Sequence, residues 1–195
     1  TTSLEWLPKF GSRIFKLNIS NSQLSTESLR TMAENSNNLR VLDLSRNNMT
    51  ELHCSSLCEL LDSAPNLSSL SLADNPEIGD KGIHQVCDTV SHRIQQLDLS
   101  NCRISKSLGI LVDTFPFLEA INLSENPLDD LLSLQEATKL KELVLQSLPL
   151  GLGNLRLVLD RWNSLQSFVA LERMDLSGNQ LTTKDLEAVG AFCCK

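Results

Sequence analysis

Residues 39–49 read Leu-Arg-Val-Leu-Asp-Leu-Ser-Arg-Asn-Asn-Met, with apolar side chains at the first, fourth, sixth and eleventh positions of the segment. The alternation around Leu42 and Leu44 is the period-two pattern of a short β-strand with one buried face. An asparagine, Asn47, follows three residues after the last of these leucines. The segment therefore predicts a strand that ends in a turn organised by a polar side chain.

The same eleven-residue pattern recurs along the chain. Successive copies are 22 to 31 residues apart, which is about 26 residues per unit, and they begin at residues 14, 39, 67, 94, 118, 140 and 171. One such unit cannot cover its own apolar face, but a stack of units buries each face against the next one. We therefore expect a single domain over residues 1–195 that folds as a solenoid of about seven units.

The ninth position of each copy holds the residue that we expect to organise the turn. An inward-facing amide there can satisfy backbone groups that the turn leaves unpaired. Asparagine fills this position at Asn47, Asn75, Asn126 and Asn179, and Cys102 fills it in the fourth unit. Ser22 and Leu148 depart from the pattern, and Leu148 casts doubt on the turn of the sixth unit.

The segments between the copies carry apolar residues at helical spacing, and residues 25–28, Ser-Thr-Glu-Ser, offer N-cap candidates for the first helix. We expect helices through residues 29–33, 50–62, 83–90, 108–112 and 186–192, with Leu52 and Leu186 among their apolar residues, and Leu157 belongs to the helix expected in the sixth unit. Residues 129–138 of the fifth unit leave room for one or two helical turns. The sixth unit is the longest, and residues 151–168 predict a loop that leads into a helix.

Repeats of this length and pattern resemble the ribonuclease-inhibitor-like branch of the leucine-rich-repeat superfamily. Residues 75–82, Asn-Pro-Glu-Ile-Gly-Asp-Lys-Gly, are the most specific local match. The resemblance implies an α/β horseshoe with a concave parallel sheet and convex helices. It also implies a protein-binding domain of a larger adaptor, receptor or scaffold, without an active site carried by the repeat residues.

Side chains between the buried strand positions are expected to face the concave sheet and to bind a partner protein there. Mixed-sign polar side chains on a curved surface suit electrostatic matching to a protein. The alternative interpretation is that acids beside the strand leucines only solvate the sheet. The candidates are Lys16, Asn18, Arg40, Asp43, Arg46, Asp74, Asp98, Asn101, Asn122, Glu125, Gln146 and Asp175.

The composition favours a protein partner over other ligands. The net charge of −7 disfavours direct nucleic-acid binding, because phosphate contacts need clustered lysine and arginine. The chain lacks an apolar run long enough to span a membrane, and we expect no cofactor and no metal. His53, Cys54 and Cys58 could form a metal or redox site, but buried helix thiols are the favoured interpretation. Neither end shows a cysteine-rich cap, so the ends of the stack are expected to offer further contacts.

No catalytic motif is present, so we do not expect an enzyme. The first alternative is a GTPase-activating regulator, in which Arg46 would stabilise phosphoryl charge in a partner's site. The second is an extracellular recognition domain, which the Asn-x-Ser/Thr sequons at Asn18, Asn48, Asn66 and Asn122 would allow. Unpaired cysteines favour an intracellular location, cytoplasmic or nuclear.

Overall fold

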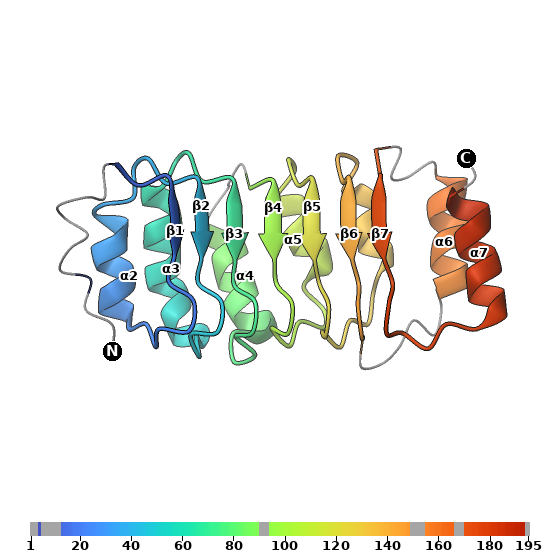
Figure 1. Cartoon of the computed structure of the whole chain (residues 1–195), viewed down its shortest axis with the longest axis horizontal. Helices are drawn as coiled ribbons and strands as arrows, with labels where there is room; N and C mark the ends of the chain where they lie inside the picture. Colours follow the sequence, from blue (N-terminus) through green and yellow to red (C-terminus); the bar gives the residue numbers. More distant parts are fainter. Residues whose placement is uncertain (1–3, 5–12, 90–93, 149–154, 166–169, 194–195) are drawn as a thin grey trace.

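A computed structural model describes residues 4, 13–89, 94–148, 155–165 and 170–193 of the chain. Seven parallel strands lie side by side in one sheet, in the order in which they occur in the sequence (Figure 1). Each strand has three residues. The strands are β1 (Lys16–Asn18), β2 (Val41–Asp43), β3 (Ser69–Ser71), β4 (Gln96–Asp98), β5 (Ala120–Asn122), β6 (Glu142–Val144) and β7 (Arg173–Asp175).

The register of the sheet confirms the alignment of the seven sequence copies. The middle residue of each strand pairs with the middle residue of the next, so that Leu42, Leu70 and Leu97 are neighbours in one row. Leu17, Ile121, Leu143 and Met174 extend this row to both ends of the sheet. The row points into one continuous aliphatic core, where Leu42 and Ile121 are each 1% exposed. The stacking of apolar faces predicted from the repeat is therefore the basis of the fold.

Helices cover the other side of the core; in Figure 1 the middle helices lie behind the strands, the first helix lies to the left of the first strand, and the last two lie to the right of the last strand. Their order along the chain is also their order in space, because each helix packs on the next. They are α2 (Thr26–Ala33), α3 (Glu51–Ser63), α4 (Gly79–Thr89), α5 (Leu108–Thr114), the 3-10 helix η2 (Leu132–Glu136), α6 (Leu155–Ser164) and α7 (Thr183–Cys193). Ser25, one of the expected N-cap candidates, caps α2, Thr50 caps α3, and the short fifth unit holds only η2.

Three leucines expected on the apolar faces of these helices are exposed instead. Leu52, Leu157 and Leu186 are 77%, 67% and 57% exposed. In α3 and α6 other residues of the helix, such as Leu57 and Val158, fill the core instead of Leu52 and Leu157. In α7 no residue is fully buried, because only α6 packs against it in the described part of the chain. The expected loop at 151–154 and Val90 lie outside the described residues.

Buried asparagines join neighbouring units through the backbone. The Asn75 amide nitrogen donates to the carbonyls of Leu72 and Ala73 in its own unit and of Leu44 in the preceding unit. Its Oδ1 accepts the N–H groups of Asn47 and Met49 at 3.0 and 2.9 Å. Asn47, Asn126 and Asn179 make equivalent contacts. The role predicted for the ninth position is confirmed.

Cys102 and Leu148 interrupt the asparagine series at the ninth position, and the structure accommodates them differently. Cys102 keeps two interactions of the series, because its thiol donates to the Leu72 carbonyl at 3.2 Å and to the Ser100 carbonyl at 3.5 Å. Leu148 is buried and brings no donor, yet the doubt about the sixth turn is wrong. Asn179 of the following unit accepts the Leu148 N–H at 2.8 Å and donates to the Leu145 carbonyl, which maintains this turn.

Asp80 provides a second connection between units, at the start of α4. Its carboxylate accepts the backbone N–H groups of Ser105 and Lys106 and the hydroxyls of Ser105 and Ser107, just before α5. Partial burial raises the pKa of Asp80. Hydrogen bonds from Ser107, Ser105 and Lys106 outweigh this effect and hold the pKa below its ordinary value of 3.8. The ionised carboxylate therefore ties the third unit to the fourth.

Replacing Asn75 should weaken the whole stack. N75A removes a buried amide and leaves carbonyls and N–H groups of two units without their partner. We expect the free energy of unfolding to fall by about 2–4 kcal/mol, measured by urea denaturation. Q95A changes an exposed residue next to β4 and serves as the control, with an expected loss below about 0.5 kcal/mol. Equal losses in the two variants would contradict the role given to Asn75.

Replacing Asp80 should produce a pH-dependent loss of stability. Because the folded-state pKa is lowered, the carboxylate contributes stability above its unfolded pKa and loses it as pH falls through the folded pKa. D80N should be less stable than the parent at pH 7 by about 1 kcal/mol. The difference should shrink as pH falls below 3.8 and through the lowered folded-state pKa, where the parent carboxyl becomes protonated. Thermal unfolding of both proteins from pH 7 to pH 2.5 measures this, and a constant difference would refute it.

Candidate protein-binding surface

The third, fifth and seventh positions of each unit project from the sheet face opposite the helices. We call this surface the concave face. Seven of the twelve predicted binding residues lie on it, which are Lys16, Asn18, Asp43, Asp98, Asn122, Gln146 and Asp175. All seven are exposed or half-buried. The strand pairing places Asn18, Asp43, Ser71, Asp98, Asn122, Val144 and Asp175 in one row across the sheet.

The other five predicted residues lie at the two edges of this face. Arg46, Asp74, Asn101 and Glu125 occupy the turn that follows each strand, at the eighth position of their units. Their backbones are left-handed, with φ between 50° and 60°. Arg40 lies at the opposite edge, before β2, where its guanidinium stands 5.7 Å from the centre of the Phe15 ring. The structure therefore divides the twelve residues among the sheet face and two edges.

We call this row across the sheet, from Asn18 to Asp175, the central row. Its side chains are fixed by contacts with their own units. The Oδ1 atoms of Asp43, Asp98 and Asp175 each accept the backbone N–H two residues later, at 2.9 to 3.0 Å. Asn18 and Asn122 do the same with Ser20 and Ser124. These side chains thus hold the end of each strand while they present polar atoms on the concave face. Structural and surface roles are combined in the same residues.

Neighbouring units also exchange side-chain contacts along the row. Asn18 donates to Asp43 at 2.7 Å, and Gln146 donates to Asp175 at 2.6 Å. The backbone N–H of Ser177 and the Gln146 amide lower the pKa of Asp175. Near the C-terminal end, Arg173 pairs with Glu142 at 3.1 Å. The concave face is therefore an ordered polar surface whose side chains are held in place before any partner binds.

A shallow depression of about 730 Å³ lies over the first four units. Its lining is polar and carries three aspartates against one arginine. The lining residues are Ser20, Asn21, Asp43, Ser45, Arg46, Ser71, Ala73, Asp74, Asp98 and Ser100. Sequence reasoning identified the charged members and Ser71 but missed Ser20, Ser45 and Ser100, although serine recurs after the sixth-position leucine in Leu44-Ser45 and Leu99-Ser100. Small hydroxyl side chains there keep the depression open between the longer side chains.

Arg46 and Asp74 form an ion pair in the wall of this depression. The Arg46 Nε lies 3.0 Å from Asp74 Oδ2, and Asn101 donates to Oδ1 at 2.9 Å. The hydrogen bond from Asn101, followed by that from Arg46, lowers the pKa of Asp74. Both side chains of the pair remain well exposed, so the pair adds little to stability. Its effect is to hold the guanidinium of Arg46 against its own domain.

The two cysteines of α3 that sequence reasoning considered for a metal or redox site lie inside the core. Cys54 and Cys58 are buried, and burial, with smaller effects of Cys58 and Glu51, raises the pKa of Cys54 to about 12. His53 Nδ1 instead contacts Thr50 at the start of α3. No group of three potential metal-binding side chains was found in the described part of the chain. The favoured interpretation of these cysteines as buried helix thiols is confirmed.

A parallel sheet backed by serial helices, buried asparagines between units and an open polar face define a repeat solenoid of the leucine-rich type. The family profile described as Leucine Rich Repeat matches residues 38–60, 93–116 and 170–192, and a second one, Leucine Rich repeat, matches residues 63–84. The chain belongs to the leucine-rich-repeat superfamily, in its ribonuclease-inhibitor-like branch.

Curated relatives support this assignment over parts of the chain. Rat "NACHT, LRR and PYD domains-containing protein 3" is 35% identical over 123 residues, which is 58% of this chain and 12% of the relative. Pig ribonuclease inhibitor is 37% identical over 89 residues, which is 42% of this chain and 19% of the inhibitor. The chain thus spans less than a fifth of the length of these relatives.

Solved structures show the same fold. A TLR13–ssRNA13 complex has a TM-score of 0.63 at 24% identity, covering 88% of this chain and 23% of the TLR13 chain. Internalin C2 of Listeria monocytogenes has a TM-score of 0.62 at 20% identity, covering 90% of this chain and 67% of internalin. At these identities the likeness concerns the fold alone. In the described residues, no helix is long and apolar enough to cross a membrane.

Proposed function

We propose that this chain is a protein-recognition domain that binds its partner on the concave face. Domains of this superfamily generally mediate recognition between proteins. The proposal rests mainly on the register of the central row. Over the first five units, this register places an exposed or half-buried polar side chain of each strand next to that of the neighbouring strand. The depression over units one to four lies directly on this row. A partner would meet a preorganised polar surface there.

The electrostatics of this surface favour specificity. Three aspartates and one arginine line the depression. A partner that presents complementary basic groups would therefore bind more specifically and associate faster than other proteins. The side chains already hydrogen-bond to their own backbone, as Asp43 does to Ser45, so few rotamers are lost on binding. Val144 is the only apolar member of the central row. Affinity would then depend on apolar contacts outside the row or on the edges of the face.

The alternatives receive less support from the geometry. A GTPase regulator would need a free arginine, but Arg46 is paired with Asp74. For a secreted domain, the amides of Asn18, Asn66 and Asn122 already take part in hydrogen bonds, although Asn48 and Asn66 are exposed. Absence of glycans at Asn48 and Asn66 in native material, measured by peptide mass spectrometry, would favour the intracellular adaptor that we propose.

Photo-crosslinking tests the concave face directly. A photoreactive amino acid replaces Ser71 at the centre of the row, or Asp88 on the exposed side of α4, and crosslinks formed in cell extract are identified by mass spectrometry. We expect a specific protein to be crosslinked from residue 71 and not from residue 88. Equal capture of that protein from both sites would contradict a concave-face interface.

Removing three charges from the row should weaken this capture. D43N/D98N/D175N discharges the surface but keeps the oxygen that accepts the N–H of Ser45, Ser100 or Ser177. We expect the yield from residue 71 to fall by about tenfold, because roughly 0.5 kcal/mol is lost at each position. The matched control, D62N/D113N/D129N, removes three exposed acids away from the concave face and should leave the yield unchanged. Charge reversal is avoided because it would also break the local hydrogen bonds.

A further inference from the structure

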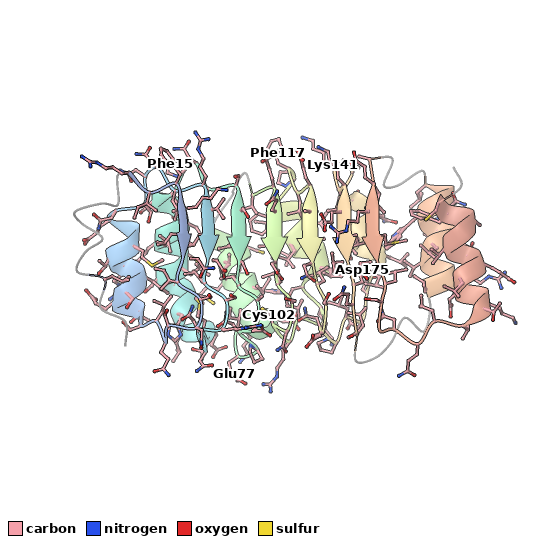
Figure 2. All side chains as sticks on the ribbon, viewed as in Figure 1. Phe15, Glu77, Cys102, Phe117, Lys141 and Asp175 are labelled. Carbon is pink, nitrogen blue, oxygen red and sulfur yellow. The ribbon has the colours of Figure 1, made fainter. Side chains whose placement is uncertain are left out.

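Two phenylalanines are exposed at the edge of the sheet where the strands begin. Phe15 precedes β1 and Phe117 precedes β5, and their side chains are 52% and 41% exposed. Figure 2 labels both along the same edge of the solenoid, above the strands. Large exposed aromatic side chains are enriched at protein interfaces. They belong neither to the core nor to the concave-face row, and the repeat pattern does not require them.

Each phenylalanine carries a cation on its ring. The Arg40 guanidinium lies 5.7 Å from the centre of the Phe15 ring, and the Lys139 ammonium lies 4.2 Å from that of Phe117. Within the described part of the chain, neither cation has a carboxylate within 4.0 Å. By contrast, Lys141 pairs with Glu119 at 2.7 Å. We call Phe15, Arg40, Phe117 and Lys139 the aromatic ledge.

The spacing of the ledge fits an extended peptide. Phe15 and Phe117 stand four units apart, which is roughly 19 Å across strands spaced about 4.8 Å apart, and Phe117 lies two residues earlier in its unit, which adds about 7 Å along the strand direction, so the two residues are separated by roughly 20 Å. An extended chain rises about 3.3 Å per residue, so this span corresponds to about six residues. Ser68 and Gln95 hold, in the third and fourth units, the position that Phe15 holds in the first, and Phe117 lies two residues before that position in the fifth unit, so the side chains between the two anchors are polar.

We propose that the aromatic ledge binds an extended acidic segment of a protein, with two apolar side chains about six residues apart. The apolar side chains pack on the edges of Phe15 and Phe117. Neighbouring carboxylates pair with Arg40 and Lys139, which their rings hold in place. This surface is distinct from the concave face, so the proposal extends the proposed function and can fail without it.

A single-stranded nucleic acid also stacks on aromatic rings and pairs with cations. The structure favours the acidic peptide. The ledge supplies only two cations without a carboxylate partner in the described residues, and Glu119 and Glu142 lie close to the same edge. The whole chain carries a charge of −7. A continuous phosphate backbone would be repelled along most of this path, whereas a peptide can place its few carboxylates at the cations.

Selection from a random twelve-residue peptide library displayed on phage tests the ledge on the full chain. We expect the enriched peptides to be acidic and to share two apolar positions five to seven residues apart. Synthetic versions are then measured by fluorescence anisotropy. R40E/K139E should lower their affinity by about tenfold or more, because two ion pairs turn into repulsions. F15S/F117S should also lower it while keeping both cations.

K106E/K184E is the matched control, because it reverses two exposed lysines elsewhere and gives the same net charge. It should change the affinity by less than about twofold. Urea midpoints confirm that all variants fold. The proposal is overturned if no acidic family is enriched, if enriched peptides bind R40E/K139E as well as the parent, or if a single-stranded oligonucleotide competes for the ledge more strongly than the peptides do. Loss of binding in both ledge variants with binding kept in the control supports it.

Discussion

The fold depends on one repeated interaction, in which a buried amide belongs to two units at once. Asn75 accepts N–H groups from the turn of the second unit and donates to carbonyls of the second and third. A buried polar group without these partners would be costly, so each unit can dock in only one register. Leucine packing alone would tolerate sliding between similar apolar faces. The amide series removes this freedom and fixes the strand alignment on which the surface is built.

The surface follows from that register. Because the middle residues of all strands align, the residues after them align as well, and Asp43, Ser71 and Asp98 become neighbours although they are 27 or 28 residues apart in sequence. The acids of this row also hold the ends of their own strands. Their conformations are therefore restricted by the scaffold. A partner binding there would pay little entropy for ordering them.

Much of this arrangement could be predicted from the sequence because it depends on periodicity. The period-two alternation identified all seven strands, and the ninth-position asparagines identified the turns. The rest depends on neighbours that a periodic pattern does not describe. The edge position of Arg40 depends on Phe15 in the preceding unit. The retained turn at Leu148 depends on Asn179, 31 residues later. Leu52 fits a helical pattern, but the pattern does not say where the buried stripe of α3 ends.

The two candidate surfaces differ in how strongly the fold restricts them. Changing Asp98 removes both a surface charge and hydrogen bonds from Ser100, so the concave face couples recognition to stability. Phe15 and Phe117 leave nearly half or more of their side chains in solvent, and each cation–π contact at such a site is worth only about 0.5–1 kcal/mol. Side chains on the ledge can therefore be exchanged at small cost to folding. The stability of the stack is roughly a sum of contacts between neighbouring units, and the ledge contributes little to these contacts. Substitutions on the ledge can therefore change which partner is bound without destabilising the scaffold.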